Sequence, residues 1–165
     1  MFSFSEYILL EKKDPESNTL HSFDIDDTLF QHDPEGLRIH VVDPHGRRSR
    51  TLTSSEYNTH SLPQGHSYDY REFKSSDAFG KHAKPIRKML AKLKAIHKNN
   101  KNVEILTARS DLDDQQKFAH HMKKYGIDIS DIHVRRAGNL NMKPHDAKAA
   151  IMHDLINKNG YKKSN

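Results

Sequence analysis

Three carboxylates stand together in the run Phe23-Asp24-Ile25-Asp26-Asp27-Thr28. Asp24 and Asp26 lie two residues apart, so in extended backbone their side chains share one face. Like charges that close repel one another unless a cation neutralises them. Divalent cations such as Mg²⁺ are bound by oxygen ligands of this kind. The run therefore predicts a divalent-metal site, and the alternative is a plain acidic turn.

Polar side chains also follow two later segments that are rich in β-forming residues. We predict parallel strands over residues 19–23, 103–107 and 132–134. The polar residues at or beyond the ends of these segments are Asp24, Asp26, Thr107, Arg109, Arg136, Gly138, Asn139, Lys143 and Lys148. Because the carboxyl ends of parallel strands converge on one crevice, we expect these residues to gather at a single site.

This set of residue types suits phosphoryl transfer through an aspartyl-phosphate. One carboxylate attacks phosphorus while its charge is screened. A second carboxyl protonates the leaving oxygen and then deprotonates water. A hydroxyl and a lysine ammonium hold the phosphoryl oxygens as charge shifts between them.

The elements that position these residues alternate between strand and helix. After Pro85, which suits a first helical turn, an apolar stripe with a basic opposite face predicts a helix. Further helices are predicted over 111–125, with Gly126 as the stop, and from about 145 to 157. The residues expected to face the core are Ile86, Met89, Leu90, Leu93, Ile96, Leu112, Phe118, Ala119, Met122, Ala147, Ala150, Ile151 and Leu155. This alternation indicates an α/β layered domain with a parallel sheet.

An insertion over residues 31–80 follows the acidic run. It begins with a predicted hairpin, in which strands 37–41 and 47–53 flank a turn at 43–46. Capping-box spacing from Thr53 to Glu56 predicts a short helix. Residues 58–80 are expected to be a loop packed over the domain. Its aromatic residues, Tyr68 among them, either touch substrate or simply hold the loop down.

The length and composition of the chain limit the number of domains, the kinds of partner and the chemistry to be expected. A length of 165 residues fits one domain, and a mean hydropathy of −0.92 fits a wet surface over a small core. The formal charge of +5 favours anionic partners without choosing among them. The chain has no cysteine, which excludes thiolate chemistry and disulfides, and its 13 histidines are too scattered to predict a metal site. With no secretory signal and no apolar run long enough to span a bilayer, we expect a cytoplasmic protein.

The chain resembles a haloacid dehalogenase-like hydrolase, whose first motif is Asp-x-Asp-x-Thr after a strand. More narrowly, the stretches 62–70, 106–111 and 133–139 resemble small phage-encoded phosphatases, which would place the protein in the host cytoplasm. The resemblance runs from about residue 19 to the end. It implies a three-layer Rossmann-like fold and Mg²⁺ as cofactor, held by the Asp24 carboxylate and the Asp26 backbone carbonyl.

The resemblance also implies individual roles. Asp24 would be the nucleophile, Asp26 the general acid and base, and Thr107 the hydroxyl of the second motif. The family lysine is either Lys143 or Lys148. We favour Lys148 because Ile151 and Leu155 follow it at the spacing of a buried helix face. Arg109, Tyr68, Arg136 and Asn139 are candidates for substrate binding. Arg109 and Asp111 could instead cap the following helix, which we favour slightly, or orient the site. Asp27 is expected to point to solvent, and Thr28 to support the loop.

The family's fourth motif, an acidic pair that ends a further strand, is missing after the last predicted helix. Its absence would remove metal ligands and bare the edge of the first strand, an aggregation hazard. A truncated chain, a second chain completing the sheet, or the extension over residues 1–18 would each explain this. In the third case, the run from Tyr7 to Leu10 would be the covering strand.

Two functions of different classes follow from the sequence. The first is a Mg²⁺-dependent phosphohydrolase that acts on a phosphomonoester, either a small molecule or a nucleic-acid end. The second is a catalytically degenerate protein that keeps the fold and a phosphate-sized pocket, and binds nucleic acid or protein. The missing fourth motif and the net positive charge favour the second.

Overall fold

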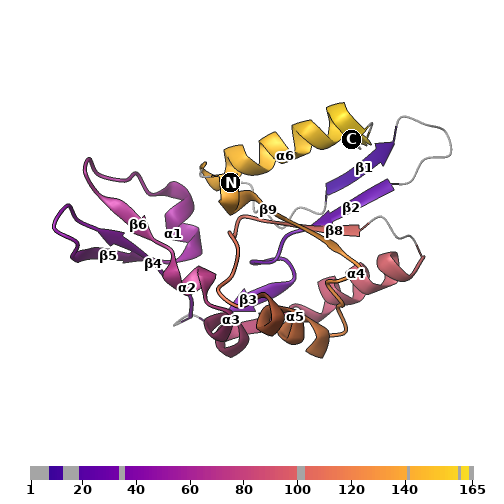
Figure 1. Ribbon diagram of the computed structural model, residues 1–165, viewed down its shortest axis with the longest axis horizontal. Coiled ribbons are helices and arrows are strands. Elements are labelled where there is room, and N and C mark those ends of the chain that lie inside the picture. Colours follow the sequence, from indigo (N-terminus) through magenta and orange to yellow (C-terminus); the bar gives the residue numbers. More distant parts are fainter. Residues whose placement is uncertain are drawn as a thin grey trace.

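The computed structural model describes residues 8–12, 19–33, 36–99, 103–140, 142–159 and 161–163. It is a mixed α/β structure built on a five-stranded sheet, with strands in the order β10-β1-β2-β8-β9 (Figure 1). Three strands are mutually parallel, namely β2 (Thr19–Phe23), β8 (Val103–Thr107) and β9 (His133–Arg136). The three predicted parallel strands are thus confirmed, with β9 displaced by one or two residues at its ends.

Helices cover both faces of this sheet, as Figure 1 shows. On one face lie α4 (Arg87–Asn99) and α5 (Gln115–Lys124). Their inward residues pack with Phe23 and Ile105 in the larger core cluster, and these are Leu90, Leu93, Phe118 and Met122. On the other face lies α6 (Pro144–Asn159), where Leu155 packs against Leu20.

Two helix predictions need correction. The helix expected from Asp111 begins only at Gln115, because Asp114 is the residue whose carboxylate accepts the N–H of Lys117 (2.8 Å). Gly126 does stop that helix, with a φ of +79° that glycine adopts without strain. In α6, Ala147 and Leu155 are buried as predicted, whereas Ala150 is exposed.

The edge of β2 is covered by the N-terminal extension. Strand β1 (Ile8–Lys12) pairs antiparallel with β2, with Leu10 opposite Leu20. This confirms a strand in the predicted run, although Tyr7 lies outside the described residues. The backbone of β2 is therefore paired on both sides, and a second chain is not needed to protect it.

A short strand also follows α6. Strand β10 (Tyr161–Lys163) pairs antiparallel with β1 at the outer edge of the sheet. No strand was expected here from the sequence, and that expectation was wrong. The new strand lies beyond β1 rather than beside β2, and it carries no acidic residue. The position next to β2 belongs to β1.

The insertion forms a small sheet of its own, which we call the cap sheet. Its order is β5-β4-β6, from β4 (Ile39–Val42), β5 (Arg48–Leu52) and β6 (Ser67–Asp69). The predicted hairpin is confirmed, and the capping box begins α1 (Ser54–Thr59) with both of its hydrogen bonds. The predicted loop over 58–80 was wrong in part, because β6 pairs with β4 within it.

Two short helices lead from the cap sheet back to the main sheet. They are α2 (Arg71–Lys74) and α3 (Ser76–His82). A two-stranded ladder of β3 (Phe30–His32) and β7 (Ala83–Pro85) joins the two ends of the insertion. The ladder fixes where the chain leaves and re-enters the main body, and Phe30 and Phe79 meet there edge to face (5.1 Å).

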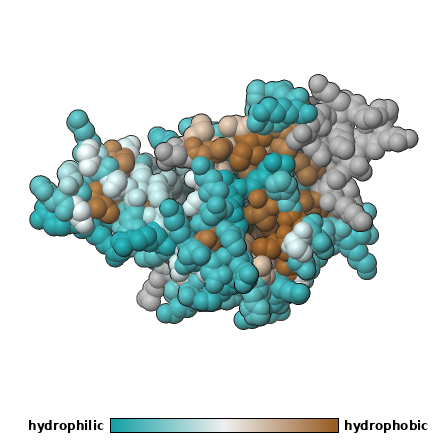
Figure 2. All heavy atoms as spheres, viewed as in Figure 1, coloured by the Kyte–Doolittle hydropathy of each residue, from teal (hydrophilic) through white to brown (hydrophobic). Residues whose placement is uncertain are grey.

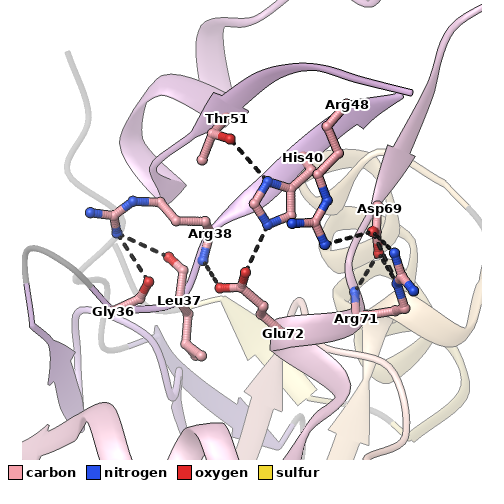
Figure 3. Close-up of polar contacts among 9 residues, drawn as sticks. All are labelled: Gly36, Leu37, Arg38, His40, Arg48, Thr51, Asp69, Arg71 and Glu72. Atoms are coloured by element: carbon pink, nitrogen blue, oxygen red, sulfur yellow. Dashed lines mark hydrogen bonds and ion pairs between the residues drawn. The ribbon is translucent and has the colours of Figure 1, made fainter. Parts of the chain in front are cut away.

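Partly buried polar contacts connect α2 to the cap sheet (Figure 3). His40 lies between Thr51 Oγ1 (3.0 Å) and Glu72 Oε1 (2.7 Å). The other oxygen of Glu72 accepts the backbone N–H of Arg38 (2.7 Å). Glu72 thereby satisfies groups on β4 and on the segment before it. This carboxylate and the half-buried Phe73, which packs against the core of the cap sheet, both hold α2 in place.

None of the helices in the described ranges combines the length and the apolar character needed to cross a membrane.

Candidate functional site

The acidic run forms a tight loop at the carboxyl end of β2. The carbonyl of Ile25 accepts the N–H groups of Leu29 (3.1 Å) and Phe30 (3.0 Å), and Asp27 donates its N–H to the Phe30 carbonyl (2.8 Å). Asp27 adopts a φ of +59°, a left-handed conformation that aspartate tolerates, and its side chain is exposed. Thr28 is buried. Both placements agree with the predictions for these two residues.

Asp24 lies at the start of this loop with both carboxylate oxygens engaged. Oδ1 accepts the N–H of Ile25 (2.8 Å), and Oδ2 forms an ion pair with Nζ of Lys148. The side chain is only 14% exposed. Burial raises the pKa of Asp24 to about 6 against the opposing attraction of Lys148, and the neighbouring charge of Asp26 raises it further.

Asp26 has the opposite environment. Its carboxylate accepts two hydrogen bonds from Arg109, from Nη2 (2.7 Å) and Nε (2.9 Å), and lies 2.5 Å from His32 Nε2. Burial by itself would raise the pKa of Asp26. The Arg109 guanidinium and the His32 contact outweigh burial and hold that pKa well below its usual range. Asp26 is therefore ionised in this arrangement.

Arg109 links the site to the insertion. Its side chain is 1% exposed, and its Nη1 donates to the carbonyl of Phe73 in α2 (2.9 Å). The guanidinium also lies over the rings of Phe73 (5.0 Å) and Phe79 (5.2 Å), as a cation–π contact. Arg109 thus orients Asp26 and does not cap the following helix. Its predicted role in binding substrate is not supported by this geometry, because the chain itself engages the guanidinium.

Thr107 is fully buried at the carboxyl end of β8, beside this group. Its Oγ1 accepts the backbone N–H of Arg109 (3.1 Å), which fixes the turn that sends Arg109 toward Asp26. The sequence predicted that Thr107 would hold phosphoryl oxygens. In this arrangement its oxygen shapes the loop.

The residues after β9 brace the loop that carries Arg109. Arg136 forms an ion pair with Asp111 (3.2 Å), and the Asn139 side chain accepts the N–H of Asp111 (3.1 Å). Gly138 must be glycine because a Cβ there would lie 2.5 Å from the backbone nitrogen of Ser110. These contacts place Arg136 and Asn139 behind the Arg109 loop, in a supporting position. Asp111 serves the same bracing and is not the helix cap.

Two of the predicted site residues lie elsewhere. Tyr68 belongs to the cap sheet, where its hydroxyl bonds His60 Nδ1 (2.9 Å) and its ring packs on Tyr57 (4.9 Å). This favours the interpretation that it holds the insertion together. Lys143 is exposed just before α6, whereas Lys148 reaches Asp24. Of the two lysines, the structure thus places Lys148 beside Asp24.

Sequence reasoning missed His32 and the backbone carbonyl of Phe73. The His32 side chain is 9% exposed, and its Nδ1 is buried without a described partner. It reaches Asp26 because the chain turns back at residues 27–30 and enters β3 alongside the loop. A histidine six residues beyond Asp26 gave no spacing signal. Phe73 contributes a backbone carbonyl, which no sequence pattern reveals.

The repulsion between the two carboxylates is already reduced by neighbouring positive side chains. Carboxylate repulsion was the reason to expect a divalent cation, but Lys148 and Arg109 already place positive charge on Asp24 and Asp26. Among the described residues there is no group of three or more acidic or histidine side chains placed to hold a metal. Asp24 and Asp26 are the two carboxylates of the loop that are mostly buried, with side chains 14% and 17% exposed. One carboxylate fits a hydrated Mg²⁺ that completes its shell with water and substrate phosphate.

Searches with protein-family models, among curated proteins and among solved structures find no significant match to this chain.

Proposed function

We propose that the chain is a phosphohydrolase that cleaves a phosphomonoester through an aspartyl-phosphate on Asp24. The observation that carries the proposal is the pairing of Asp24 with Lys148, from a segment 124 positions further along the chain. An ammonium beside the attacking carboxylate can bind a phosphoryl oxygen and offset its charge during transfer. The parallel order of β2, β8 and β9, with helices on both faces, supports a haloacid dehalogenase-like fold.

The proposed reaction has two half-reactions. In the first, an oxygen of Asp24 attacks phosphorus and the bond from phosphorus to the leaving oxygen breaks. The leaving group departs as an anion that takes its proton from water, and an acyl phosphate forms on Asp24. In the second, water attacks the acyl phosphate, inorganic phosphate leaves, and the Asp24 carboxylate is restored. An ionised Asp26 is suited to accept the proton of that water.

We also propose Mg²⁺ as the cofactor, held by the Asp24 carboxylate and the Asp26 backbone carbonyl. Bound there, it would screen the repulsion between the carboxylate and the phosphate. The partner class is then a phosphomonoester, on a small molecule or at a nucleic-acid end. The chain's own residues would supply the nucleophile, the ammonium and the proton acceptor.

The test is hydrolysis of p-nitrophenyl phosphate with Mg²⁺ and with a chelator. Asp24→Asn should abolish turnover, and Lys148→Ala should lower kcat by about 10²–10³-fold because a charge stabiliser is lost. Lys143→Ala is the matched control and should behave as wild type, since Lys143 is exposed and away from Asp24. Turnover retained by Asp24→Asn would reject the mechanism.

A degenerate phosphate-binding protein is the second candidate. It is favoured by the two ion pairs that already occupy Asp24 and Asp26, and by the lack of a described third acidic group. In that case the wild-type chain would bind inorganic phosphate in calorimetry, lose this binding in Lys148→Ala, and hydrolyse nothing with or without Mg²⁺.

A further inference from the structure

The outer surfaces of α4 and α5 form a second candidate site, on one face of the sheet. Neither helix contains an acidic residue. Their basic residues are all exposed, and we call this set the basic face: Arg87, Lys88, Lys92, Lys94, Lys98, Lys117, Lys123 and Lys124. These eight cations exceed the formal charge of +5 for the whole chain, so the remaining residues sum to −3. Figure 2 shows hydrophilic residues gathered over the lower end of the molecule, where α5 lies.

The stabilising effect of the helix dipole explains the position of only some cations in the basic face. Cations in the last turn of a helix interact favourably with its dipole, which accounts for Lys98, Lys123 and Lys124. Arg87 and Lys88 instead occupy the first turn of α4, where the dipole disfavours positive charge. Their placement therefore opposes the stability of the helix.

Contacts within the chain engage some of the other cations. Lys117 pairs with Asp77 (2.7 Å), and Lys94 donates to the carbonyl of Tyr125 at the end of α5 (3.1 Å). Within the described ranges, no acidic side chain forms an ion pair with Arg87, Lys88 or Lys124. These three cations are available to an external anion.

A groove runs between α4 and the end of α5 on this face. Its volume is about 500 Å³, and its lining combines cations with apolar atoms. The lining residues are Pro85, Arg87, Leu90, Lys94, Lys124, Tyr125 and Gly126. Lys94 is held in place because its side chain packs against Gly126, where a Cβ would lie 3.3 Å from Cδ. The groove thus gives the charges a fixed concave setting.

We propose that the basic face binds the phosphate backbone of a nucleic acid. An anionic membrane is a poorer fit, because the exposed large apolar residues of the described chain, Leu62, Leu140 and Met142, lie outside α4 and α5. From Arg87 to Lys98 the helix rises roughly 16 Å, which spans about five phosphates of one strand. None of the residues around Asp24 takes part, so this binding is separate from the proposed hydrolysis.

The test is fluorescence anisotropy with a labelled single-stranded DNA of about 20 nucleotides, titrated between about 50 and 200 mM salt. Wild type should bind with an affinity that falls steeply with salt. The variant Arg87→Gln/Lys88→Gln/Lys124→Gln should bind at least about tenfold more weakly, with a slope of log K against log salt that is shallower by about two. Lys94 is left unchanged because it holds Tyr125.

The matched control is Arg47→Gln/Arg48→Gln/Arg50→Gln, which removes the same charge from exposed positions in and beside β5. It should keep the wild-type affinity and slope. The proposal would be overturned if the two variants lost equal amounts of DNA affinity, or if wild type bound DNA with an affinity that does not depend on salt. Binding of poly-glutamate as tight as that of DNA would also overturn it, in favour of an acidic protein partner. Hydrolysis of p-nitrophenyl phosphate, assayed in parallel, should be unaffected in both variants, so the two proposals fail separately.

Discussion

Asp24 and Asp26 are the same residue type two positions apart, yet their surroundings drive their pKa values in opposite directions. Asp24 is buried with one ammonium beside it, and its pKa is raised to about 6. Asp26 is held by a buried guanidinium and a histidine, and its pKa is lowered. Two carboxyls whose environments separate their pKa values are suited to separate roles. The geometry therefore supports one nucleophile and one proton acceptor.

The raised pKa of Asp24 predicts a loss of stability as pH rises. Between about pH 4 and pH 6 the folded chain binds a proton that the unfolded chain has released, so the free energy of unfolding falls across this window. The Asp24 contribution to that fall is about 2–3 kcal/mol. Urea unfolding at pH 4 and pH 7, in chelator, should show the fall in wild type and not in Asp24→Asn. An equal fall in both proteins would mean that Asp24 is not the titrating group.

The lowered pKa of Asp26 predicts a preference among leaving groups. An ionised Asp26 protonates a leaving alkoxide poorly, so substrates whose leaving group departs as a stable anion should react faster. We expect kcat for p-nitrophenyl phosphate to exceed that for an alkyl phosphate by about 10²-fold or more. Arg109→Lys loses the bidentate contact with Asp26, so the pKa of Asp26 should rise. The difference in kcat between the two substrates should then become smaller. Equal rates for the two substrates in wild type would contradict this.

At the scale of elements, one buried charge lies between the central strands. Glu104 of β8 is buried, and its oxygens accept hydrogen bonds from Ser22 Oγ in β2 (3.2 Å) and Arg135 Nε in β9 (2.6 Å). The carboxylate thus bridges three parallel strands. A buried charge is tolerated only while it keeps such partners.

Removing Arg135 should therefore lower the free energy of unfolding more when Glu104 keeps its charge than when that charge is removed as well. Arg135→Ala leaves the Glu104 carboxylate without a counter-charge and should lower the free energy of unfolding by about 2–3 kcal/mol. The double variant Arg135→Ala/Glu104→Gln should recover part of this loss, because a neutral amide is cheaper to bury. Urea denaturation of the three proteins measures both values. A double variant less stable than Arg135→Ala would show that the charge is not the source of the cost.

At the scale of the whole molecule, the sheet is completed from both ends of the chain. Strand β1 lies beside β2, on the side where the resemblance would place an acid-bearing strand, and β10 lies beyond β1. Leu10 is opposite Leu20 on one side and Lys163 on the other. The pairing of β1 thus both shields β2 and holds β10.

Breaking β1 should expose β2 and promote aggregation. Leu10→Pro removes a backbone N–H in the middle of the strand, which a strand paired on both sides does not tolerate. Leu10→Ala keeps that N–H and is the matched control. Size-exclusion chromatography with light scattering should show aggregates for Leu10→Pro and a wild-type profile for Leu10→Ala. A wild-type profile for both variants would mean that the β1 pairing does not protect β2.

The sequence by itself determined the elements whose signal is local. Strand propensity predicted β2 and β8, and apolar periodicity predicted α4 and α6. Turn and capping residues predicted the hairpin and α1. The spacing of Asp24 and Asp26 also indicated that both side chains lie at the end of a strand. For the lysine, the sequence favoured Lys148 but left Lys143 as an alternative.

Only the tertiary structure decided what surrounds those side chains. His32 and the Phe73 carbonyl reach the site through a reversed turn and a short helix that propensity did not predict. Arg109 became a partner of Asp26 because β8 lies beside β2, and the short strands β6 and β10 formed because neighbouring edges were open to pair. Each of these depends on contacts between distant segments, whose energies no local pattern contains. The sequence identified Asp24 and Asp26 as candidate site residues, and the fold determines the pKa of each carboxyl.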